Sequence, residues 1–66
     1  MVNMDSKKIE DIARTFLSQN YSIDRIENSR LVNQTWIVEV LVSSFDKHVV
    51  KKVKISDKTG SILEVE

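Results

Sequence analysis

Cysteine and proline are absent from this sequence of 66 residues, and glycine and histidine each occur only once. Without cysteine, neither a disulfide framework nor a thiolate metal site can stabilise the fold. No proline-rich linker, repeat or low-complexity segment divides the chain, so we expect a single domain over residues 1–66. A hydrophobic core of this size leaves about 3–5 kcal/mol of net stability.

The chain also lacks an excess of either charge, because its ten basic residues balance its ten acidic ones. This balance argues against a protein whose main task is to coat DNA or an anionic membrane. No segment approaches the length of a membrane span, and no apolar run follows the lysines near the start, so no signal peptide is predicted. We therefore expect a cytoplasmic protein, or an extracytoplasmic one if an export segment has been removed.

The longest apolar run, residues 34–43, contains the only tryptophan and is rich in β-branched residues, which favours a strand. Side chains alternate between the two faces of a strand, and one face here is wholly apolar. It consists of Trp36, Val38, Val40 and Val42. We predict that this face lies in the core, and that Ile37, Glu39 and Leu41 lie on the other face.

An amphipathic helix is predicted over residues 6–20, because apolar residues recur at the spacing of one helical stripe. The stripe consists of Ile9, Ile12, Ala13, Phe16 and Leu17. Asp5 or Ser6 would cap the first turn, and Asn20 would end the helix in a left-handed conformation.

Three further strands are predicted at residues 22–32, 48–56 and 61–65, the first of them irregular with a bulge. In the second, Val49, Lys51, Val53 and Ile55 would face the core, with Lys51 snorkelling near the sheet edge. Residues 43–47 would form a hairpin loop of three to five residues. In the turn of residues 57–60, the Asp57 side chain would hold the first position and Gly60 would supply a positive φ.

The order of one helix and four strands predicts an α+β fold. In this fold the N-terminal helix packs on one face of a three- to four-stranded antiparallel meander. The run Trp36–Val40 and the run Val53–Leu63, with its Asp57, Thr59, Gly60, Ile62 and Leu63, resemble a PepSY-type domain. That resemblance implies a non-catalytic module that regulates peptidases or binds other proteins.

Catalysis and metal binding lack the residue types that they need. A Ser-His-Asp arrangement would have to combine His48, the only histidine, with Asp46 or Asp57 and a serine such as Ser44. One histidine and scattered carboxylates give no ligand spacing for a metal. We therefore predict no enzyme, no catalytic residue, no cofactor and no metal site.

Nucleic-acid binding is an alternative function, because the strand region 47–58 is rich in basic residues. These are Lys47, His48, Lys51, Lys52, Lys54 and Lys58, and Arg25 and Arg30 could add to them if the fold brings them close. A basic sheet surface can follow phosphates, whereas lysines on a strand also serve to prevent aggregation between sheet edges.

Protein binding or self-association is the function that we favour. With the helix on one face of the sheet, three large aliphatic residues on the other face would stay uncovered, next to three charged residues. These six predicted partner-binding residues are Ile37, Glu39, Leu41, Val50, Lys52 and Lys54. The sequence leaves open whether the partner is a second copy, in a homodimer, or another protein.

Overall fold

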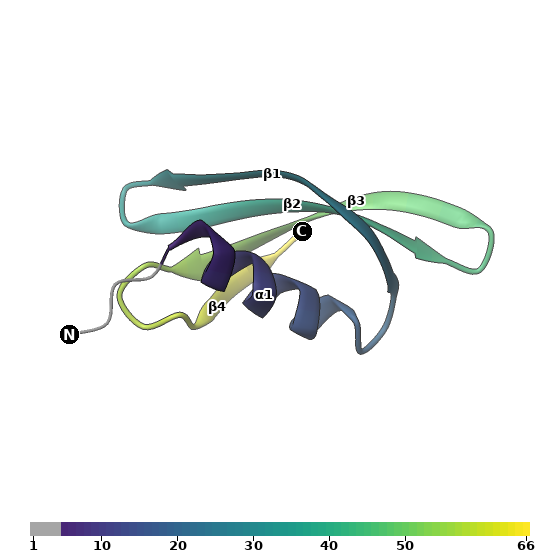
Figure 1. The fold of residues 1–66 in the computed structure, drawn as a ribbon, viewed down its shortest axis with the longest axis horizontal. Coiled ribbons are helices and arrows are strands. Elements are labelled where there is room, and N and C mark those ends of the chain that lie inside the picture. Colours follow the sequence, from purple (N-terminus) through teal and green to yellow (C-terminus); the bar gives the residue numbers. More distant parts are fainter. Residues whose placement is uncertain (1–4) are drawn as a thin grey trace.

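The computed structural model describes residues 5–66. Helix α1 (Ser6–Leu17) is followed by the strands β1 (Ser22–Val32), β2 (Thr35–Ser44), β3 (Lys47–Ser56) and β4 (Ile62–Val65). The strands form one antiparallel sheet in the order β1-β2-β3-β4, and α1 lies on one of its faces (Figure 1). The predicted α+β fold, a helix on one face of an antiparallel meander, is confirmed. No helix within residues 5–66 has the length and apolar character that crossing a membrane requires.

Helix α1 begins at a side-chain cap and ends earlier than predicted. The Asp5 carboxylate accepts a hydrogen bond of 2.9 Å from the Lys8 amide, as an N-cap does. The helix ends at Leu17, and Asn20 does not adopt the left-handed conformation that we predicted for it. Instead, the amides of Asn20 and Tyr21 both donate hydrogen bonds to the Leu17 carbonyl. This turn gives a partner to a carbonyl that would otherwise lack one at the end of the helix.

Both hairpins of the long strands close with two-residue turns. Asn33 and Gln34 both have positive φ, 50° and 65°, as a two-residue type I′ turn requires. β2 and β3 are joined by only Phe45 and Asp46, because Ser44 pairs directly with Lys47. The predicted loop of three to five residues is therefore wrong, since a bulky residue, Phe45, accepts a φ of 57° that usually belongs to glycine.

The turn before β4 uses a different side chain from the one predicted. Gly60 has the expected positive φ of 77°. The amides of Lys58 and Thr59 bond to the hydroxyl of Ser56, at 3.2 and 3.4 Å, rather than to Asp57. The Asp57 carboxylate instead accepts a hydrogen bond of 2.7 Å from the Trp36 indole, which ties this turn to the start of β2.

The core lies between α1 and the face of the sheet that it covers. Eight of the described side chains are buried to 2% exposure or less, and they come from α1, β2 and β3. They are Ile9, Ala13, Leu17, Val38, Val40, Val42, Val53 and Ile55. Trp36 is half-buried at the border of this core.

Two residues predicted for the core, Phe16 and Val49, are more than a third exposed, because α1 covers β1 and β2 better than the rest of the sheet. Phe16 is 38% exposed and lines a hollow between α1 and Ile62 of β4. Val49 is 40% exposed, because the β2–β3 hairpin extends beyond the end of the helix (Figure 1). Lys51 lies on the same side of that extension, with its Nζ 5.5 Å from the centre of the Tyr21 ring, a cation–π contact.

Candidate functional site

The face of the sheet opposite α1, which we call the open face, collects all six predicted partner-binding residues. The register of β2 and β3 places them in three directly opposed pairs. These are Ile37 with Lys54, Glu39 with Lys52, and Leu41 with Val50. Because directly opposed residues share a face, the six side chains form one block two strands wide.

Strands β1 and β4 extend this block in both directions with residues that the sequence pattern did not assign to this face. On β1, Arg30 lies opposite Ile37, Asn28 opposite Glu39, and Arg25 opposite Leu41. The register of β1 shifts between Ile23 and Arg25 and between Ile26 and Asn28, so simple alternation along the sequence could not assign its faces.

On β4, Glu64 pairs with Lys54, and the backbone of Glu66 exchanges hydrogen bonds with that of Lys52. Leu63 is not among the paired positions and the register shifts at this point. Because of this register shift, simple alternation along the sequence does not predict that Glu64 points to the open face.

Ion pairs on the open face lie both between neighbouring parts of the sheet and within β1. The Lys54 ammonium lies 3.2 Å from a Glu66 carboxylate oxygen and 3.7 Å from one of Glu64. The hydrogen bond with Glu66, reinforced by the charges of both glutamates, raises the pKa of Lys54. The same hydrogen bond from Lys54 is the main reason why the pKa of Glu66 is lowered. On β1, Arg25 pairs with Glu27 at 2.8 Å, and this bond raises the pKa of Arg25.

Three other charged side chains on the open face remain unpaired within residues 5–66. Arg30, Glu39 and Lys52 make no ion pair within 4 Å there, although Glu39 and Lys52 lie on directly opposed positions. They alternate in sign from β1 to β3. Each of these groups is therefore free to pair with a charge that a partner brings.

Aliphatic side chains lie among these charges. Ile37 and Leu41 are half-buried, and Val50 is 53% exposed. Leu41 and Val50 are directly opposed and form the apolar part of the block. A few aliphatic residues surrounded by charged ones resemble in composition the centre and rim of a protein interface.

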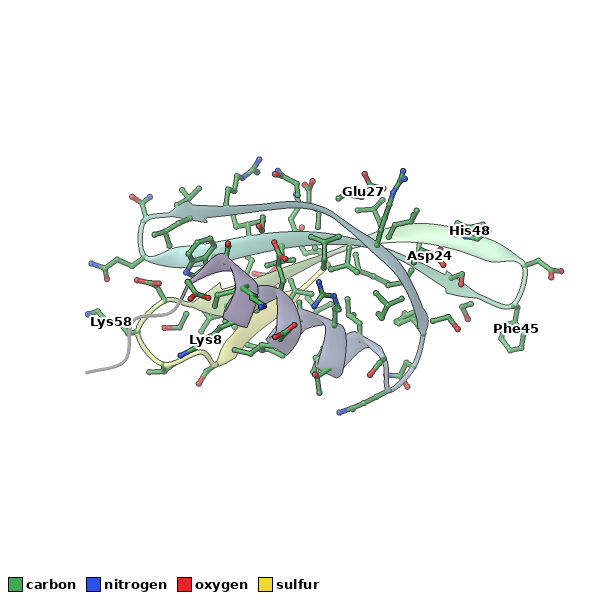
Figure 2. All side chains as sticks on the ribbon, in the orientation of Figure 1. Lys8, Asp24, Glu27, Phe45, His48 and Lys58 are labelled. Carbon is green, nitrogen blue, oxygen red and sulfur yellow. The ribbon has the colours of Figure 1, made fainter. Side chains whose placement is uncertain are left out.

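His48 lies at the distal end of the open face, beside Asp24. Its Nδ1 is 3.1 Å from an Asp24 carboxylate oxygen, and Figure 2 shows the two side chains close together where β1 meets the hairpin. The carboxylate near the histidine is thus neither Asp46 nor Asp57, the two candidates considered from the sequence. Within residues 5–66, no three His, Asp or Glu side chains are grouped as a metal site needs.

The basic residues of the region 47–58 do not gather on one surface. Lys47 and Lys51 lie opposite Ser44 and Val40, and Lys51 contacts Tyr21 on the side of the helix. Lys52 and Lys54 lie on the open face, and Lys54 is held between Glu64 and Glu66.

Comparisons with protein-family models, with curated proteins and with solved structures found no match to this chain.

Proposed function

We propose that this protein is a small, non-catalytic protein-binding or regulatory module that acts through its open face. The observation that carries the proposal is the set of three opposed pairs formed by Ile37, Glu39, Leu41, Val50, Lys52 and Lys54. Together they present aliphatic surface on a face that α1 does not cover, and two of their charges, Glu39 and Lys52, make no ion pair within residues 5–66. Burying the aliphatic surface supplies affinity, and the charges select the partner.

The resemblance to PepSY-type domains supports the same proposal, because it implies a module that binds or regulates other proteins. It also makes a peptidase one candidate for the partner. Nucleic-acid binding by the lysines of region 47–58 gains less support, because those lysines divide between the two faces and acidic residues stand beside them on the open face.

Site-specific photo-crosslinking tests this proposal even while the identity of the partner is unknown. The photoreactive residue p-benzoylphenylalanine replaces Leu41 in one variant and Val50 in another, and the variants are irradiated in cells of the source organism. A matched control carries it in place of Lys8, an exposed position on α1. Circular dichroism verifies that all three variants fold.

We expect defined crosslinked species from positions 41 and 50 and none of the same mass from position 8. The mass of each species shows whether the partner is a second copy or another protein. Crosslinking that is absent at positions 41 and 50, or equal at all three positions, would overturn the proposal.

A further inference from the structure

The charges of the open face alternate in sign from one strand to the next. Apart from the Arg25–Glu27 ion pair, whose charges cancel, β1 contributes Arg30, β2 contributes Glu39, β3 contributes Lys52 and Lys54, and β4 contributes Glu64. Across the sheet the order is positive, negative, positive, negative. When the same sheet is viewed from its other edge, the order is inverted.

An inverted order makes the open face complementary to itself in one particular arrangement. Consider two copies that face each other across a two-fold axis parallel to the strands and passing between β2 and β3. This rotation places β1 over β4 of the second copy and β2 over β3 of the second copy. Every strand then faces a strand of opposite charge.

The cross-strand register extends this charge complementarity to individual pairs of residues. A rotation about an axis parallel to the strands keeps each residue at its height along the strand, so each row of paired residues faces the same row of the second copy. Glu39 then faces Lys52 of the second copy, and Leu41 faces Val50 of the second copy. In the next row, Arg30 faces Glu64 of the second copy, because Arg30, Ile37, Lys54 and Glu64 lie in one row.

The two-fold symmetry repeats each of these contacts, which gives four ion pairs and, in the row beside them, two Leu41–Val50 contacts. Aligned sheets pack about 10 Å apart and rotated by about 30°. The rotation displaces the outer strands most and the contacts next to the axis least. The central contacts of β2 with β3 are therefore the ones that the packing of twisted sheets preserves best.

The other two-fold arrangement of facing sheets, with the axis perpendicular to the strands, is electrostatically unfavourable. It places each strand over the same strand of the second copy. Lys52 and Lys54 then face the β3 lysines of the second copy, and Glu39 faces the β2 strand that carries Glu39. Like charges across an interface cost several kcal/mol.

We propose that the occupant of the open face is a second copy of this chain, in the arrangement with β1 over β4. This inference rests on the proposed function and names its partner. The four-stranded part of the face spans roughly 20 Å across the strands and about 13 Å along the four-residue β4, an area well below the ~800 Å² per partner of a standard interface. We therefore expect a reversible homodimer with a dissociation constant on the order of 10 µM.

Charge reversal of Arg30 and Glu64 tests the arrangement, because the two side chains belong to opposite edge strands. Three strand spacings, about 14 Å, separate these strands within one copy, so the two charges do not contact each other there. R30E and E64R are prepared separately, and Lys8→Glu on α1 serves as a matched charge reversal away from the face. Sedimentation equilibrium is measured over concentrations on both sides of the expected dissociation constant.

We expect the wild type and Lys8→Glu to dimerise equally, and each single reversal on the open face to weaken dimerisation at least tenfold. An equimolar mixture of R30E and E64R should recover dimerisation. In that heterodimer the two reversed side chains face each other as one ion pair, and the native Arg30 and Glu64 of the two copies form the other. Thermal melts at low concentration verify that the monomers fold.

Two results would overturn this inference. A wild type that stays monomeric at every concentration excludes the second copy, yet leaves the proposed function intact if position 41 crosslinks to another protein. Dimers that both single reversals weaken, but that the mixture does not restore, would exclude the placement of β1 over β4.

Discussion

The two faces of strand β2 carry similar aliphatic side chains but use them differently. On the covered face, Val38, Val40 and Val42 are fully buried under α1. On the open face, Ile37 and Leu41 are only half-buried and share the surface with Glu39. The helix, rather than the hydrophobicity of the strand, decides which aliphatic residues stabilise the monomer. The aliphatic residues on the open face are thus available for binding.

The largest expected difference is in the free energy of unfolding that is lost when one aliphatic side chain is truncated on each side of the sheet. Ile9→Ala removes a fully buried side chain of α1 that packs in the core over the covered face, and should cost about 2–5 kcal/mol, most of the net stability of so small a domain. Ile37→Ala on the open face should cost less than about 1 kcal/mol in the monomer. Urea denaturation at low protein concentration, followed by Trp36 fluorescence, measures both. Equal losses would remove the distinction between the faces.

A smaller difference is expected between two hydrogen bonds, one on each side. Asp57→Ala leaves the partly buried Trp36 indole without its 2.7 Å acceptor and should cost about 1–3 kcal/mol. Asp24→Ala removes the exposed contact with His48 and should cost under about 1 kcal/mol. The shift of the urea midpoint ranks the two variants, and a larger shift for Asp24→Ala would contradict the comparison.

Phe45 belongs to neither face, and its replacement should stabilise the protein slightly. It is fully exposed at the tip of the β2–β3 hairpin, away from the helix, as Figure 2 shows. Its φ of 57° strains a residue with a Cβ atom. Phe45→Gly should therefore raise the free energy of unfolding by up to about 1 kcal/mol. The neighbouring Asp46→Gly, at a position without positive φ, should lower it, and thermal melts of both variants decide the sign.

The smallest expected effect is a dependence on pH that arises from the open face. The hydrogen bond with Lys54 lowers the pKa of Glu66 below its ordinary value of 4.5, so its stabilising effect is complete above that value. The effect is lost as the pH falls through the lowered pKa. The pKa of Lys54 is raised above 10.5, so its contribution is lost only in strong alkali. Lys54→Gln should therefore differ from the wild type in its urea midpoint at neutral pH, but not in strong acid, and the same difference at both would contradict this pairing.

Much of the fold follows from the sequence because strong local patterns agree with one another. The alternation in residues 34–43 assigned both faces of β2, and the single glycine marked the turn before β4. The end of α1 was not predicted correctly, because a turn closed by hydrogen bonds to the Leu17 carbonyl ends the helix in place of a left-handed Asn20. The two-residue turn at Phe45 and Asp46 was not predicted either, because Phe45 adopts a positive φ that is usually found at glycine.

The candidate site could be predicted only for the two regular strands. The six residues on β2 and β3 follow from alternation, and their pairing follows from the hairpin register. Arg30 and Glu64 were not assigned to the open face, because irregular pairing in β1 and β4 changes which residues point to that face. Because of these irregularities in strand pairing, the charges that the outer strands β1 and β4 place on the open face could not be predicted from the sequence.

The simple strand order has a consequence for how the chain folds. Each strand pairs with the strand next to it in the sequence, so no crossover connection has to close before the sheet can form. Pairing can begin at the tight turn of Asn33 and Gln34 or at that of Phe45 and Asp46, and then spread outward one strand at a time. Because loop closure costs little conformational entropy in such a topology, we expect the chain to reach its native state faster than a β-sandwich of similar stability.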